Sequence, residues 1–226
     1  MKPDLSLVGI GLYTTAEAGR LTRVPSKKIL RWLRGHTVGD HEYEPLWNSQ
    51  VDLGDLGTFL SFLDLVQVRV AAAFIEAGLS PQKVRKAIAH GTKILQQDYP
   101  FANARFRTDG RTVILHVLQQ GEDDRLIDLF RSGQYVMQRI IEPSLRGLEF
   151  ENDFAARWWL AGRQAKIVID PKRQFGQPID DVTGVPTVVL ARAAKSEGSI
   201  EKAARAYSVT ASSIRRAVSF EERLAA

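Results

Sequence analysis

Two stretches of this sequence carry the same pattern, two short amphipathic helices joined by a tight turn, and this repetition limits the folds open to the chain. One stretch is SIEKAARAYSVTASSIRRAV, residues 199–218, and the other is TTAEAGRLTRVPSKKILRWL, residues 14–33. Helices this short are marginal alone and are stabilised by packing an apolar face against other elements. The 226 residues suffice for one large domain or two to three small ones. The sequence therefore predicts a mainly helical protein with a helical pair near each end.

The composition is that of a soluble globular protein, with 44 % hydrophobic and 25 % charged residues. No stretch approaches the roughly 20 apolar residues that span a membrane, and the apolar run at the N-terminus is too short for a signal peptide. The absence of cysteine excludes disulfides and thiolate metal sites, and it fits a reducing compartment. We therefore expect a cytoplasmic protein that makes no membrane contact.

The sequence shows no arrangement of residues that is typical of an enzyme. It lacks a phosphate-binding glycine loop, a Ser/His/Asp arrangement and an HxxxH spacing. The acids of residues 36–64 lie in a predicted loop rather than at strand ends, so nothing fixes their geometry. His36 and His41 lie near Asp40 and Glu42, which leaves a metal site as the weaker alternative to a polar loop. We expect no catalytic activity, no metal and no cofactor.

The net charge of +5 is unevenly distributed along the chain. Residues 1–35 hold seven basic and two acidic residues, which gives +5, whereas residues 36–64 hold no Lys or Arg and six acids, which gives −6. A basic segment followed directly by an acidic one suggests two kinds of partner, although solvated surfaces would give the same pattern.

The N-terminal pair has clear start and stop signals. Thr14 or Thr15 can cap the first helix, and Glu17 in its first turn favours the helix dipole. Pro25 or Ser26 opens the second helix, which Gly35 ends. The helical spacing of the second helix separates an apolar face, formed by Ile29, Trp32 and Leu33, from a basic face, formed by Lys27, Lys28, Arg31 and Arg34.

The remainder of the chain alternates between helical and extended patterns. Residues 36–57 are predicted to form a loop or wing, and Asp109-Gly110 within 104–117 is typical of a β-hairpin turn. Residues 166–171, KIVIDP, predict a short strand that Pro171 ends. The predicted helices span residues 59–78, 79–95, 121–141, 186–198, 199–207 and 210–225.

The basic face of the N-terminal pair predicts binding to double-stranded DNA. The second helix of such a pair fits the major groove, where small polar and long basic side chains contact base edges and phosphates. Thr15, at the start of the first helix, can donate to a phosphate. A basic helix in a protein-binding module is the alternative interpretation. The predicted DNA-binding residues are Thr15, Arg23, Ser26, Lys27, Lys28, Arg31 and Arg34.

Residues 10–95 resemble the winged helix-turn-helix domain of MerR-type regulators. LYTTAEAGRLTRVPSKKILRWLR is similar to the first half of that domain, and FLDLVQVRVAAAFIEAGLSPQKVRKAI to the second. The wing of that family usually carries Arg or Lys, whereas GHTVGDHEYEPLW carries neither. Contact of this wing with phosphate would therefore depend on backbone amides, or the segment serves a protein contact.

Residues 165–225 resemble a small bacterial domain family first described as of unknown function. The motifs IDP, FGQP and GVPT occur in the family's order, ahead of a helix-turn-helix. In bacteria this domain is commonly encoded beside a PIN-like toxin, a metal-dependent ribonuclease. The whole layout resembles a VapB-type antitoxin. This resemblance implies a homodimer that binds operator DNA, represses its own operon and neutralises a PIN-like ribonuclease.

The resemblance leaves the contact with the toxin open, since an arginine could displace the toxin's metal ion or a surface could cover the site. Candidates in polar loops are Arg163, Lys172 and Arg173. The C-terminal pair offers Arg215 and Arg216, but acids at 221–222 on the same helix disfavour phosphate. We expect that pair to serve dimerisation or toxin contact rather than DNA binding.

These observations combine into one predicted architecture, mainly α with minor β. Residues 10–98 form a MerR-like winged helix-turn-helix head, residues 99–163 a middle β-hairpin and helix region, and residues 164–226 a C-terminal three-helix helix-turn-helix unit. The alternative function is a MerR-like transcriptional regulator that senses a small ligand through residues 99–163. The aromatic residues of this region would line its pocket or, in the alternative that the sequence favours, fill a hydrophobic core; they are Phe101, Phe106, Tyr135, Trp158 and Trp159.

Overall fold

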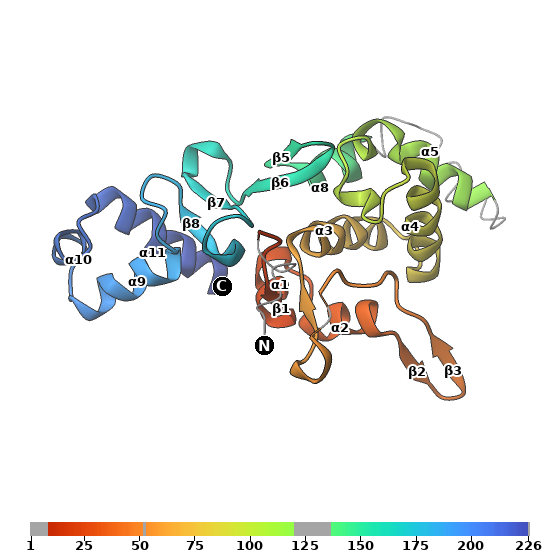
Figure 1. Cartoon of the computed structure of the whole chain (residues 1–226), viewed down its shortest axis with the longest axis horizontal. Helices are drawn as coiled ribbons and strands as arrows, with labels where there is room; N and C mark the ends of the chain where they lie inside the picture. Colours follow the sequence, from red (N-terminus) through yellow and green to blue (C-terminus); the bar gives the residue numbers. More distant parts are fainter. Residues whose placement is uncertain (1–8, 52, 120–136, 226) are drawn as a thin grey trace, which may run out of the picture. The chain divides into compact units, whose positions relative to one another are not determined.

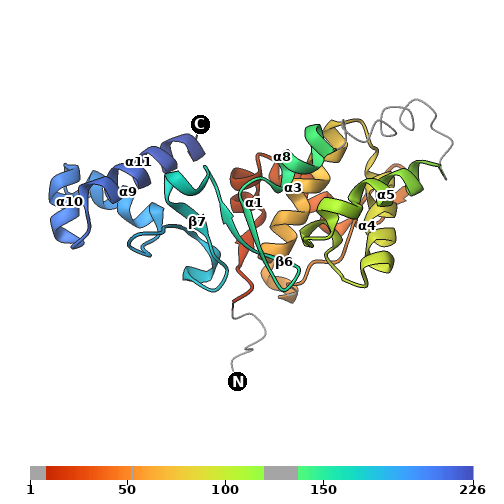
Figure 2. The same ribbon diagram turned by 90° about the horizontal axis from the view of Figure 1, so that it is seen from above.

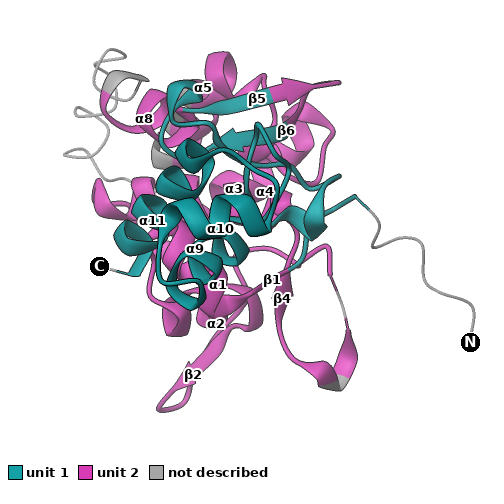
Figure 3. Ribbon diagram, turned by 90° about the vertical axis from the view of Figure 1, so that its left-hand side faces the viewer, with its two compact units in different colours: residues 1–12, 147–149, 156–226 teal, residues 13–146, 150–155 magenta. Residues whose placement is uncertain are grey.

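The computed structural model describes residues 9–51, 53–119 and 137–225. The chain divides into two compact units, shown in separate colours in Figure 3. Unit 1 comprises Met1–Leu12, Gly147–Glu149 and Ala156–Ala226, and unit 2 comprises Tyr13–Arg146 and Phe150–Ala155. Among the described residues the structure is mainly α with minor β, as the sequence predicts.

Unit 2 begins with the first predicted helical pair. Thr14 and Glu17 form a capping box, in which the Glu17 amide donates to Thr14 Oγ1 and the Thr14 amide donates to Glu17 Oε2 at 2.8 Å. A three-residue turn then leads to the second helix and to a hairpin that extends from it (Figure 1). The elements of this part are β1 (Tyr13–Thr14), α1 (Thr15–Thr22), α2 (Ser26–Arg34), β2 (His36–Val38), β3 (His41–Tyr43) and β4 (Phe59–Leu60), which pairs antiparallel with β1.

The core of unit 2 lies around α3, which Ser61 caps and which is buried along most of its length. Helices α3, α4 and α5 run close to one another in both Figures 1 and 2. Phe74 of α3 packs against Phe101 and Phe106, with ring centroids 5.7 and 6.1 Å away, and all three rings are fully buried. These elements are α3 (Phe62–Glu76), α4 (Pro81–Leu95), a 3-10 helix (Pro100–Ala102), α5 (Phe106–Gln119), a π-helical turn (Met137–Ile141) and α8 (Glu142–Leu145).

The β-hairpin predicted at Asp109-Gly110 is wrong, because both residues lie inside helix α5. The alternating pattern also contains a helical stripe, and its members Phe106, Gly110 and Val113 are all buried. Gly110 makes room for an aromatic ring rather than a turn, since a Cβ at this position would lie 2.8 Å from Phe106 Cζ. Most of the helix predicted at 121–141 falls outside the described residues.

The β-structure of the middle region occurs later in the chain, in a sheet with the strand order β5-β6-β7-β8. β5 (Leu148–Glu151) and β6 (Phe154–Trp159) contribute residues to both units. β7 (Ile167–Ile169) confirms the predicted KIVIDP strand and pairs antiparallel with β6 and with β8 (Pro178–Asp180).

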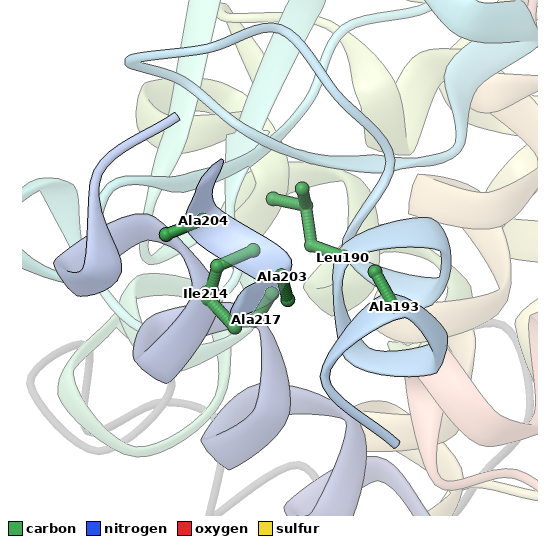
Figure 4. Packing of buried hydrophobic residues seen from close by; sticks show 6 residues of the cluster. All are labelled: Leu190, Ala193, Ala203, Ala204, Ile214 and Ala217. Carbon is green, nitrogen blue, oxygen red and sulfur yellow. The ribbon is translucent and has the colours of Figure 1, made fainter. Parts of the chain in front are cut away.

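The three predicted C-terminal helices are present in unit 1 as α9 (Thr187–Ser196), α10 (Ile200–Ala206) and α11 (Ala211–Ala225). Their shared core is small and built from short side chains (Figure 4). The buried members are Leu190, Ala193, Ala203, Ala204, Ile214 and Ala217. Because alanines let the helices approach closely but bury little apolar area, other contacts must add to the stability of this bundle.

A buried ion pair fastens α11 to the sheet. Asp180, at the end of β8, is fully buried and accepts from Arg216 Nη2 at 2.6 Å and from Arg216 Nε at 3.0 Å. The Thr183 amide also donates to Asp180, at 3.1 Å. Beside the same strand, Thr187 Oγ1 donates to the Pro178 carbonyl at 3.2 Å and to Glu221 Oε1 of α11 at 2.5 Å. Arg216 and Glu221 are thus structural.

Replacing Arg216 by methionine should lower the free energy of unfolding by about 3 kcal/mol, since it leaves the buried Asp180 carboxylate without its cation. Arg215→Met is the matched control, because Arg215 pairs with Glu201 through side chains that are both 59 % exposed. That control should change stability by less than about 0.5 kcal/mol. Urea denaturation of the three proteins measures both effects, and equal stabilities would contradict the structural role of Arg216.

Candidate nucleic-acid interface

The turn between α1 and α2 is fixed by local geometry. Arg23, the C-cap of α1, adopts the left-handed conformation with φ of 62° and is exposed. Val24 is buried, and Pro25 places its carbonyl to accept from the Lys28 and Ile29 amides at 2.8 and 3.1 Å. These contacts set the angle at which α2 leaves the turn.

Helix α2 separates its two faces as the sequence predicts. Ile29, Trp32 and Leu33 are buried, with exposed fractions of 0, 4 and 8 %. Lys28 is half-buried, and its Nζ lies 5.2 Å from the Trp32 ring centroid. The opposite face exposes its cations to solvent, and these are Lys27, Arg31 and Arg34.

A two-stranded hairpin, β2–β3, follows α2 directly. Gly35 permits this close succession, because its φ is 70° and a Cβ there would lie 2.3 Å from the Tyr43 carbonyl oxygen. The rings of His36 and Tyr43 stack across the strands, with centroids 4.8 Å apart. Past the hairpin, the Leu46 amide donates to the Trp32 carbonyl at 2.7 Å, which satisfies a carbonyl in the last turn of α2.

A groove of about 980 Å³ lies between α2, the β2–β3 hairpin and the start of α4. Lys27, Lys28 and Arg31 line its α2 side, so the structure brings together three of the predicted DNA-binding residues. The lining outside α2 comprises Pro25, His36, Glu42, Tyr43, Glu44, Leu46, Pro81, Gln82 and Arg85. The arrangement offers cations along one wall and aromatic surface beside them.

Arg85, which sequence reasoning missed, lies in this groove although it comes from α4. It forms an ion pair with Glu44, just after β3. The side chains of Arg85 and Glu44 are 34 and 74 % exposed, so the pair is open to solvent. No local sequence pattern places Arg85 near α2, because its contact with Glu44 depends on how the residues after the hairpin pack against the start of α4. His36 contributes a buried Nδ1 that has no hydrogen-bond partner among the described residues.

The segment that leads from the hairpin back to α3 is held by the buried carboxylate of Asp64. Asp64 is 0 % exposed and accepts from Trp47 Nε1 at 2.8 Å, Ser49 Oγ at 2.9 Å and the Gln50 amide at 3.2 Å. It also accepts from the amide and hydroxyl of Ser61, both at 2.9 Å, which completes the N-cap of α3. One carboxylate therefore connects residues 47–50, which we call the wing segment, to the start of α3.

Two further polar contacts support unit 2 around this network. The Tyr99 hydroxyl donates to the Asn48 carbonyl at 3.4 Å, and burial, followed by the nearby Asp64 and Asp98, raises the pKa of Tyr99. Arg69 of α3 donates to the Pro143 and Arg146 carbonyls at 2.9 and 3.0 Å. Burial, followed by Arg146, lowers the pKa of Arg69 to about 10.

The remaining predicted DNA-binding residues lie around the helical pair but outside the groove lining. Thr15 is the first residue of α1, and the preceding Thr14 provides the cap. Ser26 opens α2, and Arg23 and Arg34 are exposed in the turn and at the helix end. These positions stay predicted contacts.

The residues predicted to contact a toxin lie in the loops of unit 1. Arg163 forms an ion pair with Glu149, and its side chain is 74 % exposed. Arg173 pairs with Asp181 at 3.6 Å, and the exposed Lys172 donates from its amide to Asp170 at 3.0 Å. Arg163 and Arg173 are thus partly neutralised, and all three side chains are accessible from solvent.

The aromatic residues considered for a ligand pocket in 99–163 do not form one cluster. Phe101 and Phe106 fill the core of unit 2, with ring centroids 4.7 Å apart. Trp159 donates from Nε1 to Glu149 at 2.8 Å within unit 1, and Trp158 is buried. Tyr135 lies outside the described residues.

The described part of the chain holds no group of three or more His, Cys, Asp or Glu residues that could bind a metal. Nor does it contain a helix with the length and apolarity required to cross a membrane.

A curated relative and a solved structure are similar to this chain over more than nine-tenths of its length. No family model matches the sequence. The chain is 26 % identical over 223 residues to the Mycobacterium tuberculosis protein named "Putative antitoxin VapB45", which covers 92 % of this chain and 93 % of the relative. It also resembles the crystal structure of Rv2018 from Mycobacterium tuberculosis, with a TM-score of 0.67 and 25 % identity over 93 % of this chain and 98 % of that one.

The similarity supports the resemblance to a VapB-type antitoxin. The relative's name is that of a non-enzymatic regulatory protein, in agreement with the sequence prediction that this chain is not an enzyme. Each match covers more than nine-tenths of both chains.

Replacing Asp64 by asparagine should destabilise unit 2 by about 2–3 kcal/mol, since the amide removes one acceptor oxygen and directs N–H groups at buried donors. Asp98→Asn, a change of the same type at an exposed residue of the same unit, should shift stability by less than about 0.5 kcal/mol. Thermal unfolding followed by circular dichroism compares the two variants with the wild type. A wild-type transition for Asp64→Asn would show that the network does not hold the wing segment.

Proposed function

We propose that this chain is the antitoxin of a type II toxin–antitoxin system, which binds operator DNA through unit 2 and a PIN-like ribonuclease through unit 1. In this proposal, residues 10–98 form a MerR-like winged helix-turn-helix DNA-binding domain and residues 164–226 a helix-turn-helix-like antitoxin domain, with residues 99–163 between them. The proposal is supported above all by the similarity, over 92 % of this chain, to a protein whose name describes an antitoxin.

The DNA-binding part of the proposal is supported by the division of α2 into two faces. Its apolar face is used in packing, so its exposed cations Lys27, Arg31 and Arg34 are available to DNA. A helix of nine residues spans about 13 Å and fits the major groove of B-DNA. The β2–β3 hairpin lies beside this helix across the groove that Arg85 also lines, and in this proposal it serves as the wing.

The lack of basic side chains in the β2–β3 hairpin determines which of its groups could contact DNA phosphates. Residues 36–43 contain no Lys or Arg, and Glu42 and Glu44 lie on the groove. Contact with phosphates there would come from backbone amides, at the exposed turn Gly39-Asp40. Arg85 adds a cation that would serve phosphate once its pair with Glu44 opens.

A homodimer suits this role, because its two DNA-binding domains would occupy the adjacent half-sites of a near-palindromic operator. Binding of one domain raises the effective concentration of the second, which increases the overall affinity. Repression of the chain's own operon follows if the operator overlaps the promoter. The proposed DNA contacts are Thr15, Arg23, Ser26, Lys27, Lys28, Arg31 and Arg34.

The double variant Lys27→Ala/Arg31→Ala should weaken binding to DNA from the chain's own promoter by at least about tenfold and reduce the slope of log K against log salt by about two. A fluorescence anisotropy titration at several salt concentrations measures both quantities. Lys202→Ala/Arg205→Ala is the control, since it removes the same charge from exposed residues of α10. Equal losses in the two double variants would contradict a specific role of α2.

The partner-binding part of the proposal is supported by unit 1, in which two charged residues of α11 are held in contacts within the unit. Arg216 is bound to Asp180 and Glu221 to Thr187, so α11 has little free charge for phosphate at these positions. The loops around β7 and β8 instead present accessible cations that could reach an acidic metal site. These candidates are Arg163, Lys172 and Arg173.

The purified chain should suppress the activity of the PIN-like ribonuclease encoded beside it, in an assay of RNA cleavage with increasing amounts of the chain. If a cation enters the toxin's metal site, the triple variant Arg163→Ala/Lys172→Ala/Arg173→Ala should restore at least about tenfold activity. Lys195→Ala/Lys202→Ala/Arg205→Ala removes the same charge from α9 and α10 and should still inhibit. Undiminished inhibition by the first variant would show that none of the three cations is required.

A further inference from the structure

Phe175 is the most exposed large aromatic side chain among the described residues of unit 1, with 75 % of its surface accessible. It lies in the loop Asp170–Gln177, which joins β7 to β8. A second apolar residue, Val182, is 60 % exposed in the turn that follows β8. Neither residue contributes to the core of the unit, so the folded chain gains nothing from an apolar side chain at these places.

The backbone at Phe175 is held in an uncommon conformation. Gln174, Phe175 and Gly176 are three successive residues with positive φ, at 48°, 53° and 80°. Positive φ is unfavourable for residues with a Cβ, above all for a bulky one such as phenylalanine. An arrangement of this kind persists only when the surrounding structure determines it, and such outliers are concentrated at functional sites.

Hydrogen bonds on both sides of Phe175 hold its backbone in the positive-φ conformation. The Leu12 amide donates to the Phe175 carbonyl at 3.0 Å, and the Gly176 and Gln177 amides donate to the Arg173 and Gln174 carbonyls at 2.9 and 3.0 Å. The loop begins at Asp170, which is 3 % exposed and accepts from the Lys172 amide and from Arg157 Nε at 3.0 and 3.1 Å. The ring is therefore presented to solvent by a preorganised loop.

The loop also folds back toward the turn after β8. Arg173 Nη1 lies 3.6 Å from Asp181 Oδ1, and a Cβ at Gly184 would lie 2.8 Å from Arg173 Nη2. The Asp181 amide in turn donates to the Lys166 carbonyl at 2.8 Å. These contacts connect the loop that carries Phe175, Lys172 and Arg173 with the turn after β8 that carries Val182.

The charges around Phe175 identify the kind of partner. Within residues 163–177 the basic residues are Arg163, Lys166, Lys172 and Arg173. All four are exposed, although Arg163 and Arg173 form ion pairs with Glu149 and Asp181. The sole acid of this range, Asp170, is buried and paired with Arg157. A second copy of the chain, docked symmetrically on this loop, would bring these like charges together, which disfavours self-association here.

We propose that Phe175 is the anchor by which this chain binds its ribonuclease partner, inserted into an apolar pocket that is rimmed by acidic residues. The inference rests on the proposed antitoxin function and names the contact that the function requires. Val182 favours a protein over a nucleic acid, because an exposed aliphatic side chain cannot stack on a base as an aromatic ring can. Lys172 and Arg173 lie at the edge of the contact and pair with the acidic rim.

The test is the affinity of the full-length chain for the PIN-like ribonuclease encoded beside it, measured by isothermal titration calorimetry. Phe175→Ala should weaken binding at least about thirtyfold, as truncation of an interface anchor does, whereas Phe175→Leu should retain most of the affinity. Tyr207→Ala, a substitution at another exposed aromatic residue of unit 1, should bind within about twofold of the wild type. The melting temperature of Phe175→Ala and its affinity for operator DNA should match those of the wild type.

The outcomes separate this inference from the function on which it rests. If the wild type does not bind the ribonuclease, the proposed function fails and the anchor with it. If the wild type binds and Phe175→Ala binds equally well, the function stands and the anchor is wrong. Loss of self-association in Phe175→Ala, measured by sedimentation, would make a second copy the occupant, and loss of DNA affinity would make it nucleic acid. Either result overturns the proposal.

Discussion

The buried carboxylate of Asp64 is the interaction on which the candidate DNA-binding surface depends. It accepts hydrogen bonds from Trp47, Ser49 and Gln50, which follow the hairpin, and from Ser61, which caps α3. A buried carboxylate of this kind is stable only when its lone pairs are satisfied, so the segment after the hairpin has one geometry that suits it. The same segment places the Leu46 amide on the end of α2 and Glu44 against Arg85. The β2–β3 hairpin, the basic face of α2 and α4 are therefore positioned together.

Unit 1 depends on a similar device at Asp180, which binds Arg216 of α11 and the Thr183 amide. The core of its three helices consists largely of alanine, so a buried ion pair has more influence here than it would in a larger core. The two units differ in what they leave exposed. Unit 2 presents cations on a short helix beside a hairpin, whereas unit 1 presents cations together with an apolar residue on a constrained loop.

Local signals in the sequence were sufficient to predict most of the helices. The cap of α1, which is Thr14 of the two threonines considered, and the apolar spacing of α2 are short-range features, and both are present. The helix predicted at residues 79–95 is present as α4 (Pro81–Leu95). The hairpin at Asp109-Gly110 failed because an alternating pattern and a helical stripe overlap there, and packing of Phe106 against Gly110 decided between them. The basic face of α2 was predictable for the same local reason.

What the sequence could not supply was contact between distant residues. The pairing of Arg85 with Glu44 joins residues 41 positions apart, and no periodicity indicates it. The Asp64 network has the same character, since Trp47 is 17 positions away. Phe175 belongs to the motif FGQP, but its exposure could not be predicted, because its φ of 53° accompanies hydrogen bonds of the neighbouring backbone and not a turn signal at that position.

The proposed function gives the two units separate partners, DNA for unit 2 and the ribonuclease for unit 1. Hydrogen–deuterium exchange of the full chain, alone and with each partner, would show which residues each partner protects. We expect slower exchange in residues 23–43 with operator DNA, and slower exchange in residues 163–184 with the ribonuclease. Protection of residues 210–216 by DNA, without protection of residues 23–43, would contradict the proposed function and assign DNA reading to the C-terminal helices.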